Sequence, residues 1–88
     1  MDAHVVSEAL VLAEAAGTLR EAAQVLRDRY APLRIVVVDA FDMREETPAA
    51  AGATRSLYYG ASDGHCWQVT SDPAHAAALF IADRASSP

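Results

Sequence analysis

The chain has 88 residues, fewer than the ~100 to 150 of a typical domain, so we predict a single domain over residues 1–88 with a frayed tail at 85–88. Hydrophobic residues make up 52% of the chain and charged residues 22%, a composition that is typical of folded proteins and argues against a disordered chain. The net charge is −5 and the seven arginines are scattered singly, with no lysine in the chain. We therefore expect neither nucleic acid nor an anionic membrane as the main partner.

The residues that bear on the cellular compartment indicate a cytoplasmic protein. Cys66 is the only cysteine, so the chain can form neither an intramolecular disulfide nor a zinc site of several thiolates. Met1–His4 lacks the positive charge that begins a signal peptide, and no apolar run approaches the ~18 residues of a membrane span. The 20 alanines, together with the absence of lysine and asparagine, are typical of a GC-rich bacterial genome.

A long amphipathic helical pattern opens the chain. Apolar residues alternate spacings of four and three, as on one face of a helix, at Val5, Ala9, Leu12, Ala16, Leu19, Ala23, Leu26 and Tyr30. Gly17 is the usual residue just past a helix end, and Thr18–Glu21 matches a capping box that begins a new helix. Two interpretations stay open, one helix bent at Gly17 or a pair of helices, and the unbroken stripe favours the bent helix.

Pro32 should end this helix, because the residue before a proline is pushed out of the α region. The β-branched run at residues 33–38 then predicts a strand, which we place at the centre of the sheet and extend with a loosening pattern to Met43. Residues 44–54 are expected to form a loop. One helical turn could begin there at Thr47-Pro48 and close at Gly52.

Two further strands and a final helix are expected in the second half of the chain. Residues 55–59 and 65–70 read as a β-hairpin joined by the turn-forming residues 60–64. Asp72 and Pro73 form a helix start, with Asp72 as the cap, so residues 74–83 are predicted to be helical. The apolar cluster at residues 79–81 could begin a fourth strand instead, but the cap favours the helix.

The predicted fold class is therefore α+β. The element order is α-β-β-β-α, and a three-stranded antiparallel sheet carries the helices on one face.

Nucleic-acid binding is a less favoured function. Residues 18–26 resemble the opening helix of Fis-type DNA-binding domains, but residues 27–32 supply neither the glycine turn nor a recognition helix. The predicted element order is that of double-stranded-RNA-binding domains. Those domains hold phosphates with lysines at the start of the last helix, where this chain has Asp72–His75.

The alternative function is a small-molecule or metal-binding domain centred on His65, Cys66 and Asp39. The spacing of these residues and of nearby carboxylates fits no zinc or EF-hand pattern. As neighbours on a strand, His65 and Cys66 point to opposite faces, so the histidine is badly placed to act as a base for the thiol. We therefore predict no catalytic residue, no metal ligand and no cofactor, and we do not expect an enzyme.

The favoured function rests on the aromatic residues of the predicted sheet. Tyr58 and Tyr59 must face opposite sides, so with helices on one face only, some rings should stay exposed on the other. An open aromatic face rimmed by carboxylates is typical of a protein-interaction surface. We expect a small accessory or regulatory protein that binds another protein, or itself as a homodimer through the sheet face or the first helix. The predicted binding residues are Phe41, Tyr58, Tyr59, Trp67, Asp39 and Asp42.

Overall fold

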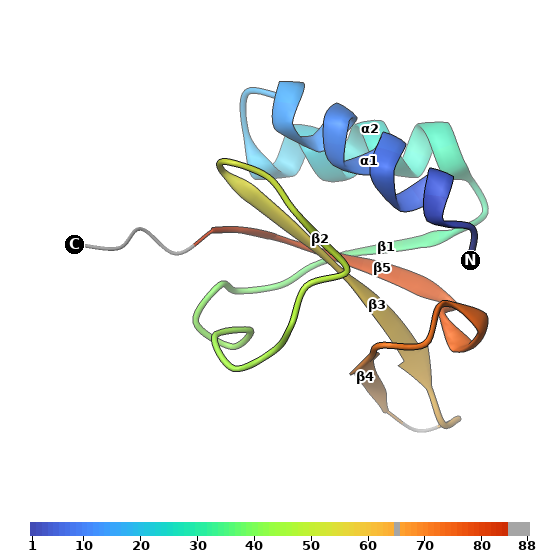
Figure 1. The fold of residues 1–88 in the computed structure, drawn as a ribbon. Coiled ribbons are helices and arrows are strands. Elements are labelled where there is room, and N and C mark those ends of the chain that lie inside the picture. Colours follow the sequence, from blue (N-terminus) through green and yellow to red (C-terminus); the bar gives the residue numbers. More distant parts are fainter. Residues whose placement is uncertain (65, 85–88) are drawn as a thin grey trace.

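Two helices and a mixed sheet form two layers in the computed structural model, which describes residues 1–64 and 66–84. Both helices lie on the same face of the sheet (Figure 1). The α+β class is as expected, but the three-stranded antiparallel sheet, the C-terminal helix and the order α-β-β-β-α are wrong. The described residues form two helices followed by five strands.

The N-terminal helical region is a pair of helices, so the prediction of one bent helix is wrong. Helix α1 (Ala3–Ala15) ends where Ala16 takes an extended conformation, and α2 (Leu19–Tyr30) runs back alongside it (Figure 1). The predicted capping box is present in part, since the Thr18 hydroxyl accepts a hydrogen bond from the Glu21 N–H at 3.1 Å. The reversal at residues 16–18 gives each helix its own buried face, Val6, Ala9 and Ala13 on α1 and Ala22, Ala23 and Leu26 on α2.

The sheet contains parallel and antiparallel pairs in the order β1-β5-β3-β2. Strand β1 (Arg34–Val37) runs parallel to β5 (Ala78–Asp83), which pairs antiparallel with β3 (Arg55–Ser62). The short strand β2 (Ala50–Ala51) and β4 (Trp67–Thr70) both pair antiparallel with β3. Strand β5 occupies one edge of β3, so β2 and β4 both lie along the opposite edge. There β2 pairs near the start of β3 and β4 pairs near its end. Strand β1 is thus an edge strand and not the predicted central one.

The predicted C-terminal helix is instead the central strand β5. The Asp72 side chain does accept a hydrogen bond from the Ala74 N–H at 2.9 Å, but only the 3₁₀ turn η1 (Pro73–His75) follows it. Strand β5 is covered on both faces, so its residues from Ala78 to Ala82 are all buried and their sequence shows no alternation of apolar and polar residues. A short apolar run of this kind cannot be distinguished from a buried helix by periodicity.

The predicted hairpin is confirmed, with a longer first strand than expected. Strand β3 continues through Gly60 to Ser62 and β4 begins only at Trp67, so the bounds of both strands differ from the predicted 55–59 and 65–70. His65 lies outside the described residues. The helical turn expected at Thr47-Pro48 is absent from the described residues, where β2 forms against β3 instead.

Each face of the sheet has its own apolar core. The first core lies between the helices and the sheet and includes Ile35, Leu57, Leu79 and Ile81. The second core lies on the helix-free face and contains Tyr58 and Phe80, with partly buried side chains from the segment after β1 and from β4 packed against it. Small alanines on both helices allow these helices to approach the sheet closely.

A polar cluster joins the end of α1 to the start of β3. The buried Arg55 donates two hydrogen bonds from one guanidinium nitrogen to the backbone oxygens of Ala13 (2.7 Å) and Ala16 (2.8 Å). These oxygens belong to the last turn of α1, whose carbonyl groups lack partners within the helix. The Glu14 carboxylate accepts hydrogen bonds from the N–H and hydroxyl groups of Thr54 and from the Arg55 N–H at 2.6 Å. The two side chains together fix α1 to the sheet.

Candidate protein-binding surface

The structure places the two predicted tyrosines on opposite faces of the sheet, as expected, but both are buried. Tyr59 is 9% exposed and packs in the core beneath the helices, and Tyr58 is 7% exposed in the helix-free core. The expectation of an exposed tyrosine ring is therefore wrong. The physical reason is that the segment after β1 folds back under the sheet (Figure 1) and packs Met43 into the helix-free core.

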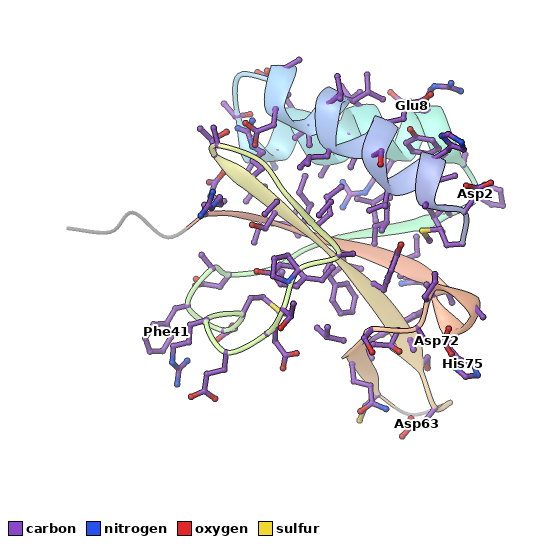
Figure 2. All side chains as sticks on the ribbon, in the orientation of Figure 1. Asp2, Glu8, Phe41, Asp63, Asp72 and His75 are labelled. Carbon is purple, nitrogen blue, oxygen red and sulfur yellow. The ribbon has the colours of Figure 1, made fainter. Side chains whose placement is uncertain are left out.

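Phe41 is the most exposed aromatic residue of the predicted set, at 67%. It lies in the segment after β1, and its ring points away from the body of the protein (Figure 2). The Asp39 carboxylate accepts a hydrogen bond from the Phe41 N–H at 2.7 Å, and the Arg44 guanidinium donates one to the Phe41 carbonyl oxygen at 2.8 Å. The guanidinium carbon of Arg44 also lies 4.1 Å from the centre of the Phe41 ring. The hydrogen bonds hold the backbone of Phe41, and the Arg44 guanidinium packs against its exposed ring.

Trp67 is the second exposed ring, at 41%. It begins β4 and meets Phe80 edge-on, with ring centres 6.4 Å apart and an interplanar angle of 77°. The Arg34 guanidinium, from β1 at the far edge of the sheet, lies 5.7 Å from the Trp67 ring centre. The Arg34 side chain reaches Trp67 across β5 and β3. At this point the two strands carry only small residues, because Ala78 of β5 pairs with Gly60 of β3. Trp67 is thus anchored on one side and open on the other.

Four exposed carboxylates lie in the same segment as Phe41. Asp39, Asp42, Glu45 and Glu46 are all exposed, and with Arg44 as the only basic residue the segment 39–46 carries a net charge of −3, from four acidic residues and one basic. The structure therefore brings together Phe41, Asp39 and Asp42 of the predicted site in one segment, while Trp67 stands on a separate strand. The arginines that hold the rings were missed. Arg44 follows Phe41 by three residues, which is a turn spacing, whereas nothing in the sequence links Arg34 to Trp67.

A polar pocket of about 200 Å³ lies beneath the same segment. Its lining combines two carboxylates and two guanidinium groups with a serine and a tyrosine, and consists of Ala40, Met43, Arg44, Glu46, Ser56, Tyr58, Asp83 and Arg84. Ser56 and Tyr58 are buried on β3 and form part of its wall. No sequence pattern marked this pocket, because its walls come from three separate parts of the chain.

The residues of the alternative small-molecule or metal site are not brought together in the described structure. Asp39 lines a cavity with residues of α2, β1 and β5, whereas the exposed Cys66 lies in the turn before β4, where its N–H donates a hydrogen bond to Asp63 at 2.9 Å. His65 lies outside the described residues. Among residues 1–64 and 66–84, no group of three His, Cys, Asp or Glu side chains is placed to hold a metal ion.

Comparison with known protein families, with curated proteins and with solved structures gave no significant match. Within the described part of the chain, neither helix has the length and apolar character required to cross a membrane.

Proposed function

We propose that this chain is a small protein-binding module whose binding surface is the helix-free side, with Phe41 and Trp67 as its main apolar contacts. The observation that supports this proposal is Phe41, whose ring is two-thirds exposed and lies against the Arg44 guanidinium, while Asp39 and Arg44 hold its backbone. A residue whose backbone is already held and whose ring has a packing partner loses less conformational freedom on binding, so more of its contact energy appears as affinity. Aromatic side chains are enriched among the residues that dominate binding energy.

The charge around the ring favours a basic partner. Segment 39–46 carries four exposed carboxylates in addition to Phe41, and complementary charge increases the rate of association and selects among partners. The proposed partner is therefore a protein with a basic segment that also contains an apolar side chain for the Phe41 ring.

The test compares Phe41→Ala with wild type in affinity capture from lysate of the source organism, read by quantitative mass spectrometry. Val11→Ala is the matched control, because Val11 is 69% exposed on α1, in the opposite layer. We expect a basic protein that wild type and Val11→Ala retain in equal amounts and that Phe41→Ala loses. With that protein purified, the Kd should rise about tenfold or more for Phe41→Ala, the scale of a single interface hot spot.

Trp67→Ala provides a second variant, and its fluorescence provides a direct reading, because Trp67 is the only tryptophan. Binding of the partner should shift the emission to shorter wavelength as the exposed side of the ring is covered. If all the variants captured the same proteins, or if the captured partner left the Trp67 emission unchanged, the proposed surface would be wrong.

A further inference from the structure

Strand β1 has an open edge. It pairs with β5 on one side, and no other strand of the described residues pairs with it. The Val38 N–H donates to the Ile81 oxygen at 2.9 Å, which turns the backbone groups of Val36 toward β5 and those of Ile35 and Val37 outward. Arg27 confirms this direction, because its guanidinium donates to the Ile35 oxygen at 3.1 and 3.3 Å. Within the described residues, no hydrogen bond is recorded for the outward N–H and C=O of Val37.

A groove runs beside this edge, between β1 and α2. It consists of two adjoining cavities of about 430 and 470 Å³ that share Leu19 and Val37. Ala23 also lines the cavity of 470 Å³, so the middle of the groove is apolar. The Val37 side chain is 44% exposed there.

The two ends of the groove carry opposite charge. Arg20 and Arg27 line one cavity, and Asp39 and Asp83 line the other. A surface with an apolar centre and opposite charges at its two ends is complementary to itself after a rotation of 180°. Twofold pairing of identical surfaces is the commonest form of protein dimer.

We propose that β1 pairs antiparallel with β1 of a second copy of this chain, with the twofold axis at Val37. The outward N–H and C=O of Val37 then bond to the same groups of the second copy, and the Val37 side chains meet in the apolar middle of the groove. In this register Ile35 lies opposite Asp39 of the second copy. Arg27, which reaches the Ile35 oxygen, is thereby brought beside that carboxylate, once on each side of the axis.

The helix layer leaves room for this pairing. Helix α2 packs on β1 and β5, and α1 packs on β3 and β2, so each helix covers about two strands. Strands are spaced ~4.8 Å apart, so two strands span about the 8–10 Å at which helices pack side by side. When β1 of a second copy is added beside β1, the α2 helices of the two copies are also separated by about two strands. They therefore pack at the ordinary distance between neighbouring helices. The pairing uses an edge of the sheet that contains neither Phe41 nor Trp67. Asp39 belongs to both surfaces, because its carboxylate also accepts the hydrogen bond from the Phe41 N–H, so variants other than Asp39→Arg separate the two proposals.

Charge exchange across the interface tests the proposal most directly. Sedimentation velocity over a concentration series should show a monomer–dimer equilibrium for wild type. Arg27→Asp and Asp39→Arg should each raise the dimer Kd about tenfold or more by placing like charges together, and the double variant should recover most of the loss. Asp42→Arg makes the same charge change outside the groove and should leave the dimer unchanged.

Val37→Pro tests the strand pairing without a change of charge. The Val37 N–H points outward, so proline removes a donor to the second copy while the β1–β5 ladder keeps its hydrogen bonds. We expect a folded monomer with the circular dichroism spectrum of wild type. A wild-type protein that stays monomeric at the highest attainable concentration would overturn the proposal, and so would a dimer that none of these variants weakens. Phe41→Ala should leave the dimer intact, which separates this result from the test of the partner-binding surface.

Discussion

Replacement of Arg55 by methionine tests the bond between the helix layer and the sheet. Methionine keeps much of the apolar length of the side chain and removes both hydrogen bonds to the last turn of α1. Hydrogen bonds that involve a charged group contribute ~1.5–3 kcal/mol each, so two of them amount to about 3–6 kcal/mol. The Arg55 Nε also lies 3.3 Å from an Asp83 oxygen, but it makes no hydrogen bond there and the carboxylate is exposed, so this ion pair contributes little to stability.

That loss is large for a protein of this size. A stability of ~0.05–0.15 kcal/mol per residue gives about 4–13 kcal/mol for the whole chain. A loss of about 4 kcal/mol should therefore lower Tm by at least about 15 °C, from ~4–8 °C per kcal/mol in small domains. Arg55→Lys should recover only part of it, because an ammonium group cannot reproduce the geometry of the guanidinium.

The assay is urea unfolding followed both by circular dichroism and by Trp67 fluorescence, so that the helix layer and the sheet are observed separately. Val11→Ala is the control, because Val11 is 69% exposed on α1 and lines neither cavity of the groove beside β1; it should stay within ~0.5 kcal/mol of wild type. The reasoning is refuted if Arg55→Met costs less than about 1 kcal/mol. Water would then satisfy the freed oxygens of Ala13 and Ala16, and packing alone would hold α1 on the sheet.

Three further substitutions test other parts of the structure. An added Cβ at Gly60 would lie 2.7 Å from the Phe80 ring, so Gly60→Ala should lower the free energy of unfolding by ~1–3 kcal/mol. It should also alter the emission of Trp67, whose ring contacts Phe80, and an unchanged emission spectrum would contradict this packing. A Cβ at Gly52 would meet the Glu14 carboxyl group at 2.5 Å, so Gly52→Ala should lower Tm in wild type and much less in a Glu14→Ala background; equal losses in both would exclude this contact. Burial and a hydrogen bond to Glu8 raise the pKa of Tyr30 from 10.0 to about 12, which favours the neutral phenol in the folded state. The stabilisation from Tyr30 is thus complete below pH 10 and lost as pH rises toward 12, so Tyr30→Phe should show a shallower fall of Tm over that range, and parallel curves would contradict this assignment.

Hydrogen bonds from Thr54 and Arg55 also bear on how α1 responds to acid. Burial acts to raise the pKa of Glu14, but these hydrogen bonds to the carboxylate outweigh it and lower the pKa from its usual 4.5. A lowered pKa in the folded state means that the stabilisation is present above pH 4.5 and is lost as pH falls through the folded value. The difference in Tm between wild type and Glu14→Gln should therefore shrink in acid.

The sequence was sufficient wherever a local rule acts alone. Thr18 caps α2 and Asp72 caps η1, as the sequence predicted. Each cap is a hydrogen bond between a side-chain oxygen and an N–H group two or three residues later, so it depends only on neighbouring residues. The hairpin of β3 and β4 likewise follows from turn chemistry between two strand-forming runs. Tyr58 and Tyr59 lie on opposite faces because the alternation of a strand fixes this without reference to the rest of the fold.

Tertiary structure decided which apolar segments became central and which rings stayed exposed. Residues 78–82 could pack as a buried helix or a buried strand, and only the pairing of β5 with both β1 and β3 selects the strand. The burial of Tyr58 depends on a segment that folds under the sheet and packs Met43 against it, a long-range contact that spacing along the chain cannot encode. The same holds for Arg34, whose position at the Trp67 ring is set by the order of strands between them. Local chemistry thus determined the caps and the turn, and the competition among segments for the same buried space determined the sheet and the surface that it presents.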